Sequence, residues 1–495
     1  MESKKKNGFA SSFGFIMAAA GSAIGLGNLW GFPYKTAKGG GAAFVLIYIA
    51  CVLFIGCVIM LAEMHLGKRA HANPVTALKN VNKNIGWFGV LAVLIPFFIT
   101  CYYSVLGGWT VKYAVNSFAG NSGIVAEFST NTFEVILFTA VFVGLAFAII
   151  AGGVEGGIEK LSKILMPALF IILLGIVVYS LCLGDGVAEG LAFYLKPDFS
   201  KVDFSTILMA MGQAFWSLSL GMGIIITYGS YCHEDIDIVK STGMICIFDT
   251  LAALLAGLAI FPAVAHFDPS LLDGSKGLAL IYIILPQVFE SMGFIGKIVS
   301  FLFFVMVTIA ALTSIMSLYE VCTQFVIQKF HTNRKASIGV VALLSFVISI
   351  PVGISLGHVG ILEEASPALF GLDWLTFFDE VTNTVAMPIC ALMSCIAAGW
   401  FLKPEKMFSE MKAEGSKIPA FVEKIYPVFV KFITPALVII VEIGGLKSEI
   451  EAGNIAVIIG AVILIAISIV VYYAFFVNSY TGTNEDEKLA KGAKN

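Results

Sequence analysis

Apolar runs long enough to cross a bilayer recur along the whole of this 495-residue chain. A transmembrane helix needs about 20 mainly apolar residues to cross ~30 Å of hydrocarbon. With 58% hydrophobic and only 13% charged residues, the chain leaves little material for a soluble domain. We therefore predict an all-α membrane protein, surrounded by membrane lipid, with about twelve transmembrane helices. The runs are 11–37, 42–66, 86–118, 131–152, 157–183, 204–232, 239–266, 294–328, 336–354, 374–402, 427–446 and 454–477.

Lysine and arginine residues are concentrated at the two chain ends and in alternate loops, above all in the 403–426 segment. Cytoplasmic loops of membrane proteins carry an excess of these residues. We therefore expect both termini in the cytoplasm and the protein in the plasma (inner) membrane. The net charge of −3 and the absence of a basic stripe exclude a nucleic-acid partner. The oligomeric state stays open.

Two of the predicted helices are interrupted by small residues. The first contains GSAIGLGNLWGFP at 21–33 and is broken at 21–27, and the sixth contains SLSLGMG at 217–223. These breaks lie five helices apart, which predicts two five-helix repeats of inverted orientation within one domain over 1–495. Residues 11–232 would hold the first repeat and the start of the second, 204–402 the second repeat, and 427–477 two additional helices.

Broken helices in a membrane indicate a binding site. An unpaired backbone group in lipid costs several kcal/mol, so a break persists only where it is buried in protein or lines a cavity. The alternative is close helix packing, for which Gly21 and Gly25 have the right spacing. Polar residues border both breaks, which favours the first interpretation. Freed carbonyls can bind a cation, and the N-terminus of the resumed helix favours an anion such as a carboxylate.

Further polar groups lie in the seventh and eighth predicted helices. Asp249 is a lone carboxylate in an apolar run, and such residues mark functional sites by default. Thr313 and Ser314 add hydroxyls, which could instead bond to carbonyls of their own helix. An oxygen-only set suits a small monovalent cation rather than a transition metal. No arrangement of nucleophile, base and orienting group is present, so we do not expect an enzyme.

Several motifs together resemble the neurotransmitter:sodium symporter family in order and spacing. They are GSAIGLGNLWGFP, KLSKILMP (160–167), GQAFWSLSLGMG (212–223), ITYGSY (226–231), the Asp249 run and AALTS (310–314). The resemblance covers residues 9–478. It implies the LeuT-type fold of bacterial amino acid carriers, whose broken helices hold the ligands at the bilayer midplane. It also implies sodium-coupled import by alternating access, with two bound sodium ions.

The resemblance also implies which residues bind the ions and the substrate. The first sodium ion would be bound by the substrate carboxylate and by Ala23, Asn28, Ser217 and Asp249. The second would be bound by Gly21, Ile24, Ala310, Thr313 and Ser314. The substrate carboxylate would contact Leu26, Gly27 and Tyr103, and its ammonium group would contact Ala23, Trp216 and Ser219. The substrate side chain would be enclosed by Ser22, Ile99, Tyr103, Trp216, Met222, Ser314 and Leu318. Ser217 is expected to contribute to substrate binding as well as to the first sodium site.

Three positions indicate the substrate class by comparison with that family. Monoamine carriers have Asp where this chain has Gly25, so the substrate here should bring its own carboxylate. Carriers of longer amino acids such as γ-aminobutyrate tend to have Gly at the position of Leu26, which favours an α-amino acid. The predicted pocket contains no charge, and an unpaired buried charge is costly. We therefore expect neutral, mainly hydrophobic L-amino acids.

The resemblance bears on two further questions, whether transport requires chloride and whether the protein transports the amino acid that it binds. Relatives that need chloride have Asn and Ser where this chain has Asp249 and Ala253, and a fixed carboxylate can supply the same negative charge. We expect chloride-independent transport. The alternative function is a membrane receptor that binds an amino acid without transporting it. A channel is a further rival.

The sequence departs from the family at both gates. The Arg that usually pairs with an outer acid, here Asp379, is replaced by Gly31. One hypothesis is that Trp216 fills the space of the missing Arg, and the alternative is a tolerant position assisted by Lys35 or Lys38. At the inner gate the usual Arg, Trp and Asp correspond to Lys6, Phe9 and Gln328, which cannot form the usual ion pair. Glu63 is expected to cap free amides of a broken helix.

Overall fold

The computed structural model describes residues 8–121, 123–273, 280–358 and 372–477, which are almost entirely helical. The first half of the chain forms α1 Ser12–Ala23, α2 Phe32–Lys38, α3 Ala42–Cys51, α4 Cys57–Ala70, α5 Pro74–Val81, α6 Gly86–Asn116, α7 Ile124–Thr130, α8 Thr132–Ala151, α9 Lys160–Leu181 and α10 Val187–Leu195. The π-helical turns η1 Gly27–Gly31, η2 Val52–Gly56 and η4 Val154–Glu159 continue three of these helices.

The second half forms α11 Phe204–Ser217, α12 Ile224–Ser230, α13 Ile238–Phe267, α14 Leu285–Ser291, α15 Gly293–Phe330, α16 Arg334–His358, α17 Trp374–Asp379, α18 Met387–Ile396, α19 Pro404–Ala413, α20 Ala420–Val428, α21 Thr434–Glu451 and α22 Ile455–Tyr472. The turns η8 Glu380–Ala386, η9 Ala397–Leu402, η10 Phe429–Ile433 and η11 Tyr473–Val477 extend the neighbouring helices. Short 3₁₀ or π-helical turns cover 83–85, 199–201, 269–273 and 280–284.

The described residues contain ten helices long and apolar enough to cross a membrane. An eleventh span is the pair 12–23 and 27–38, whose two parts are bent by 50°. The remaining predicted span, 204–232, consists of the short helices α11 and α12, separated by residues 218–223. Each apolar run of the sequence therefore has a helical counterpart, and the first and sixth are broken where expected.

The break between α11 and α12 requires unusual backbone conformations. Ser219, Gly221 and Gly223 all have positive φ, at 55°, 72° and 70°. A Cβ at Gly221 would also lie 2.3 Å from the Met387 carbonyl oxygen. Glycine is thus needed at this position for two reasons, the left-handed conformation and the close approach of α18.

A carboxylate caps the same break, as expected for Glu63. The Gly221 N–H donates to Glu63 Oε1 at 3.1 Å, and the Ser394 hydroxyl donates to the same oxygen at 2.9 Å. Glu63 is buried in α4 and Ser394 lies on α18. One acid therefore satisfies an amide that the break leaves free and joins two helices to it.

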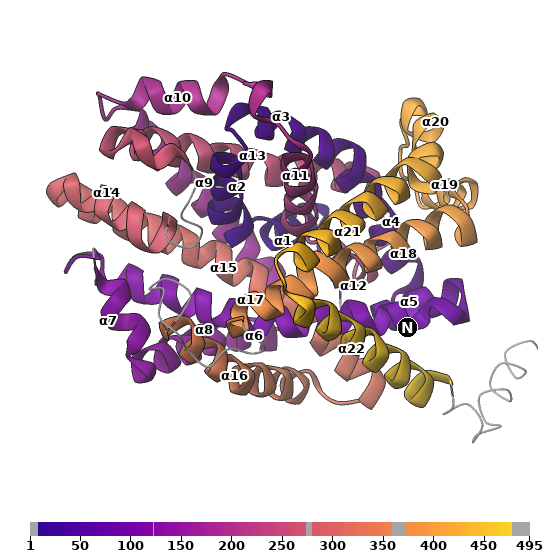
Figure 1. Ribbon diagram of the computed structural model, residues 1–495. Coiled ribbons are helices and arrows are strands. Elements are labelled where there is room, and N and C mark those ends of the chain that lie inside the picture. Colours follow the sequence, from indigo (N-terminus) through magenta and orange to yellow (C-terminus); the bar gives the residue numbers. More distant parts are fainter. Residues whose placement is uncertain (1–7, 122, 274–279, 359–371, 478–495) are drawn as a thin grey trace, which may run out of the picture.

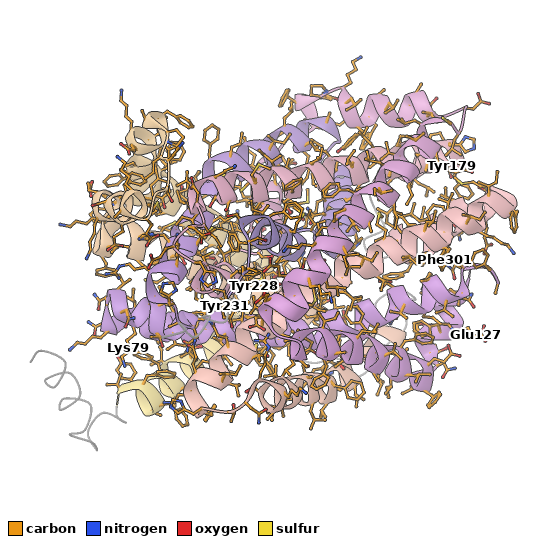
Figure 2. All side chains as sticks on the ribbon, turned by 180° about the vertical axis from the view of Figure 1, so that it is seen from behind. Lys79, Glu127, Tyr179, Tyr228, Tyr231 and Phe301 are labelled. Atoms are coloured by element: carbon orange, nitrogen blue, oxygen red, sulfur yellow. The ribbon has the colours of Figure 1, made fainter. Side chains whose placement is uncertain are left out.

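The broken helices lie in the middle of the bundle. Figure 1 shows α1 and α12 surrounded by longer helices, with α21 and α22 on the face toward the viewer. The α1 helix packs against α9, α13 and α15. From behind, Tyr228 and Tyr231 of the α12 segment also lie in the interior (Figure 2). The bundle thus encloses both breaks, where their free backbone groups are shielded from lipid.

A buried lysine joins three segments at the end of α4. The Lys68 ammonium group is only 2% exposed and pairs with Glu414 at 2.9 Å. It also donates to the carbonyl oxygens of Glu234 and Ile236, at 3.1 and 2.8 Å. These two residues lie between α12 and α13, and Glu414 directly follows α19. Lys68 therefore connects α4 with the loops on either side of it.

Replacing Lys68 with Met should lower stability by about 1–3 kcal/mol, because the buried Ile236 carbonyl oxygen and the partly buried Glu234 carbonyl oxygen lose their donor. We expect a clear decrease in the apparent melting temperature of the purified protein in detergent. Lys447→Met is the matched control, since the Lys447 side chain is 73% exposed and pairs with the likewise exposed Glu451. Equal melting temperatures for the two variants would show that Lys68 does not stabilise the fold.

Candidate functional site

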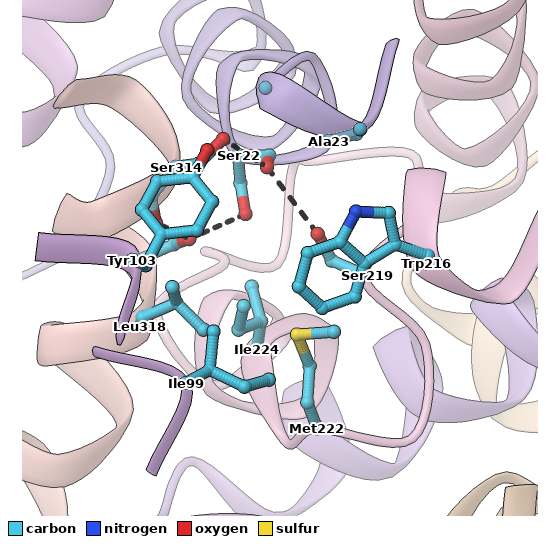
Figure 3. A pocket seen from close by; sticks show the side chains of 13 residues that line it. Ser22, Ala23, Ile99, Tyr103, Trp216, Ser219, Met222, Ile224, Ser314 and Leu318 are labelled. Carbon is cyan, nitrogen blue, oxygen red and sulfur yellow. Dashed lines mark hydrogen bonds between the residues drawn. The ribbon is translucent and has the colours of Figure 1, made fainter. Parts of the chain in front are cut away.

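A cavity of about 30 Å³ lies where the two breaks meet (Figure 3). All the residues predicted to bind the substrate line it except Leu26 and Ser217. Gly25, Ile224 and Ser317 line it as well and were not predicted as ligands. The full lining is Ser22, Ala23, Gly25, Gly27, Ile99, Tyr103, Trp216, Ser219, Met222, Ile224, Ser314, Ser317 and Leu318. No member of this lining is charged.

The cavity has a polar and an apolar part. In Figure 3 the oxygen atoms of Ser22, Tyr103, Ser219 and Ser314 gather on one side, while a wall of aliphatic and thioether side chains lies opposite. That wall consists of Ile99, Met222, Ile224 and Leu318, all buried. Such a division suits a molecule with a polar end and an apolar end.

Two glycines allow side chains to approach the broken first span closely. A Cβ at Gly25 would lie 2.3 Å from the Ser314 hydroxyl and 2.9 Å from the Tyr103 hydroxyl. A Cβ at Gly27 would lie 2.6 Å from Cδ1 of Trp216. The Leu26 N–H donates to the Tyr103 hydroxyl at 3.2 Å. Leu26 is thus beside the cavity, and its backbone amide points to one of the lining residues.

A second polar cluster surrounds Asp249, which is fully buried in α13. The Asn28 amide nitrogen donates to Asp249 Oδ1 at 2.7 Å and to Ser217 Oγ at 3.0 Å. The Ser217 hydroxyl lies 2.9 and 2.8 Å from the two carboxylate oxygens. Tyr48 on α3 also donates to Asp249, at 3.2 Å. The structure therefore brings together Asn28, Ser217 and Asp249 from three separate helices.

This cluster fits a sodium ion. Among the described residues, Asp249 forms no ion pair. The polar partners of its carboxylate there are the neutral donors of Asn28, Tyr48 and Ser217. A buried carboxylate without a positive partner is unfavourable. The carboxylate and hydroxyl oxygens here are the hard ligands that such a cation prefers, while the Asn28 side-chain oxygen accepts from the Gly25 N–H at 3.3 Å. A monovalent cation would supply the missing charge.

The residues predicted for the second sodium ion lie where α1 meets α15. A Cβ at Gly21 would lie 3.3 Å from Thr313 Cβ, so these two residues are close. The Thr313 hydroxyl donates to the carbonyls of Ile309 and Ala310 of its own helix, at 3.1 and 3.0 Å. The Ser314 hydroxyl donates to the Ser22 carbonyl at 3.0 Å. The back-bonding alternative therefore describes Thr313 in this structure, whereas Ser314 bridges α15 to α1.

The residue beside Gly31 is Gln213 and not Trp216. A Cβ at Gly31 would lie 3.5 Å from Gln213 Oε1, and Trp216 contacts Gly27, one turn away. The buried Gln213 donates from Nε2 to the Gly27 carbonyl at 2.9 Å. Asp379 is hydrogen bonded instead by Tyr102, at 2.7 Å. Trp216 does not lie within 4 Å of a Cβ at Gly31, and that it fills the space farther out, where an arginine head group would lie, stays a hypothesis.

Aromatic rings pack together at the N-terminal end of the broken first span. The fully buried ring of Phe9 lies 5.2, 5.5 and 6.4 Å from the rings of Phe15, Tyr228 and Tyr231. Gln328 accepts hydrogen bonds from the backbone and side-chain nitrogens of Asn73, both at 2.8 Å. Lys6 lies outside the described residues.

A buried ion pair lies next to these rings. Arg334 pairs with the fully buried Glu320, which also accepts from the Tyr231 hydroxyl at 2.6 Å. Arg334 lines a cavity of about 1040 Å³ that Tyr231 and Gln328 also border. A large cavity thus reaches the ring cluster around Phe9, and the sequence alone gave no role to the Glu320 pair.

The sequence matches the sodium:neurotransmitter symporter family over residues 6–133 and 125–480. It is 34% identical over 459 residues to the uncharacterized sodium-dependent transporter YhdH of Bacillus subtilis, covering 89% of this chain and 98% of that protein. It is 31% identical over 468 residues to an uncharacterized sodium-dependent transporter of Haemophilus influenzae, covering 90% and 99% of the two chains.

A solved structure is similar over the same extent. The crystal structure of MhsT in complex with L-phenylalanine superposes with a TM-score of 0.80 and 34% sequence identity. The similarity covers 89% of this chain and all of that one. The arrangement of helices described above is therefore shared with a transporter whose structure contains a bound amino acid.

Proposed function

Because this chain belongs to the sodium:neurotransmitter symporter family, and so is a sodium-dependent membrane transporter and not an enzyme, we propose that it imports neutral, mainly hydrophobic L-amino acids by alternating access. The observation that carries this proposal is the cavity between the two breaks, which has one polar and one apolar side and no charged lining residue. MhsT binds L-phenylalanine in a similar structure.

The polar side of the cavity suits the two charged groups of an α-amino acid. The Tyr103 hydroxyl and the Leu26 amide lie 3.2 Å apart and would bind the carboxylate together. The Ala23 carbonyl, at the end of α1, and the Trp216 carbonyl, which has a second lone pair beside its bond from the Ser219 N–H at 3.2 Å, would accept from the ammonium group. A charged side chain would face only Ile99, Met222, Ile224 and Leu318 or neutral hydroxyls, where burial without a partner is costly.

Two sodium ions are proposed to bind beside the substrate. Asp249, with Asn28 and Ser217, would hold the first next to the substrate carboxylate, so that each ligand strengthens binding of the other. The second would bind where Gly21 of α1 faces Thr313 of α15. Because Asp249 supplies a permanent negative charge at the first site, transport should not require chloride. We also propose that both termini face the cytoplasm and that the chain forms inverted five-helix repeats.

Uptake by proteoliposomes tests this function directly. A panel of labelled L-amino acids is offered with an inward sodium gradient, and equimolar choline replaces sodium in the control. We expect sodium-dependent accumulation of hydrophobic amino acids and exclusion of Lys, Arg, Asp and Glu. Sodium-dependent binding without accumulation would reject transport of that substrate and favour a receptor. Currents far above carrier turnover would indicate a channel.

A further inference from the structure

We propose that Ser22 and Ser317 form a hydrogen-bond-accepting subsite, which selects, among neutral L-amino acids, those whose side chain carries an O–H or N–H donor. This inference rests on the proposed function and concerns the substrate preference of the same cavity. The two serines come from the last turn of α1 and the middle of α15, and both line the cavity. They are 3% and 0% exposed.

The protons of both hydroxyls are already used within the protein. Ser22 Oγ donates to Ser317 Oγ at 2.6 Å, and Ser317 Oγ donates to the Ser314 carbonyl oxygen at 2.7 Å. This chain of bonds fixes the direction of donation, because the final acceptor is a carbonyl and cannot donate. Neither hydroxyl is therefore free to donate to a ligand without breaking a bond.

Acceptor capacity remains on Ser22. A hydroxyl oxygen has two acceptor lone pairs, and no described residue donates to Ser22 Oγ. The neighbouring hydroxyls of Ser219 and Ser314 both donate to the Ser22 carbonyl, at 3.4 and 3.0 Å. Figure 3 shows the Ser22 side chain between Tyr103 and Ser219, at the polar side of the cavity. A ligand can therefore donate a hydrogen bond to the serine oxygens of the lining. None of the four serine hydroxyls can donate to the ligand without first breaking a bond within the protein.

This pattern distinguishes side chains by chemistry rather than by size. The opposite wall of Ile99, Met222, Ile224 and Leu318 favours an apolar body, while Ser22 favours a donor on it. Threonine or tyrosine meets both conditions, whereas valine or phenylalanine leaves the acceptor lone pairs of the Ser22 oxygen unused. One hydrogen bond of this kind changes relative affinity by about three- to tenfold. The subsite therefore shifts the preference toward amphipathic side chains.

Competition by matched amino acids tests the subsite. Sodium-dependent binding of a labelled substrate to the full-length protein is competed with valine against threonine and with phenylalanine against tyrosine. In the unaltered protein we expect the donor to be favoured in at least one pair. Ser22→Ala should reduce that preference three- to tenfold. Ser349→Ala is the matched control, because Ser349 is a buried serine of α16 bonded to its own helix.

A second variant tests the direction of donation. Ser317→Ala removes the acceptor of the Ser22 proton, so Ser22 becomes able to donate to a ligand. This variant should gain affinity for O-methylserine, whose ether oxygen only accepts. An unchanged affinity for O-methylserine would contradict the arrangement of protons described above.

The possible failures can be told apart. If the protein binds amino acids but Ser22→Ala leaves both preferences within twofold, or if Ser349→Ala changes them equally, the subsite is refuted while the proposed function stands. If the unaltered protein binds no amino acid in a sodium-dependent manner, the proposed function and the subsite are both refuted.

Discussion

Asp249→Asn is expected to weaken the apparent affinity for sodium roughly a hundred- to a thousandfold. At an effective dielectric constant of about 20, opposite unit charges ~4 Å apart attract by about 4 kcal/mol, which is close to a thousandfold in affinity. Asparagine keeps the size of the side chain but removes this attraction. It also places an amide donor among three groups that already donate, those of Asn28, Ser217 and Tyr48.

The measurement is the sodium dependence of amino acid uptake in proteoliposomes, with Asp185→Asn as the control. Asp185 is exposed and lies between α9 and α10, away from the cluster. Replacing chloride with gluconate should leave uptake by the unaltered protein unchanged. A variant with normal sodium dependence would show that Asp249 is not an ion ligand. Loss of uptake on removal of chloride alone would show that its carboxylate does not replace chloride.

Gly25→Ala should weaken amino acid binding by about thirtyfold, since two hydrogen bonds of about 1 kcal/mol each must be disturbed. The added methyl group would lie 2.3 Å from the Ser314 hydroxyl and 2.9 Å from the Tyr103 hydroxyl. Ser314 would have to leave the Ser22 carbonyl, and Tyr103 would have to move from the Leu26 amide. Equilibrium binding of the labelled substrate measures the effect.

Two further variants make this test specific. Gly175→Ala should bind normally, because no neighbouring atom lies within 4 Å of a Cβ at that exposed position of α9. Combining Gly25→Ala with Ser314→Ala removes the nearest clashing atom, so the double variant should bind better than the two single effects would predict. Strictly additive effects would indicate that the two residues do not interact.

The positions of the helix breaks could be predicted because their cause is local. Glycine and serine clusters at 21–27 and 217–223 weaken a helix wherever they occur, and lipid tolerates such breaks only inside the bundle. Asp249 could be assigned in the same way, because a lone carboxylate in an apolar run is conspicuous in the sequence. The resemblance to a known family then supplied most of the lining residues.

Contacts that depend on the register between helices could not be predicted. Gln213 and Trp216 lie one turn apart on α11, and only the packing of α11 against the first span decides which of them meets Gly31. Tyr48 bonds to Asp249 from α3, where nothing in the sequence distinguishes it from other buried tyrosines. Ser317 did leave a signal, since residues 314, 317 and 318 share one helical face.

The contact between α11 and the broken first span carries no formal charge. At Gly27 it consists of the Gln213 amide on the carbonyl oxygen and the Trp216 ring beside the glycine. Dissolved ions screen charges and not neutral dipoles of this kind, and neither group titrates at physiological pH. With both termini in the cytoplasm, as we propose, this contact would face the exterior, and a change of salinity or acidity in the medium would not loosen it. In the same proposed orientation the charged Arg334 and Glu320 pair would lie toward the cytoplasm, where pH and ionic strength are regulated.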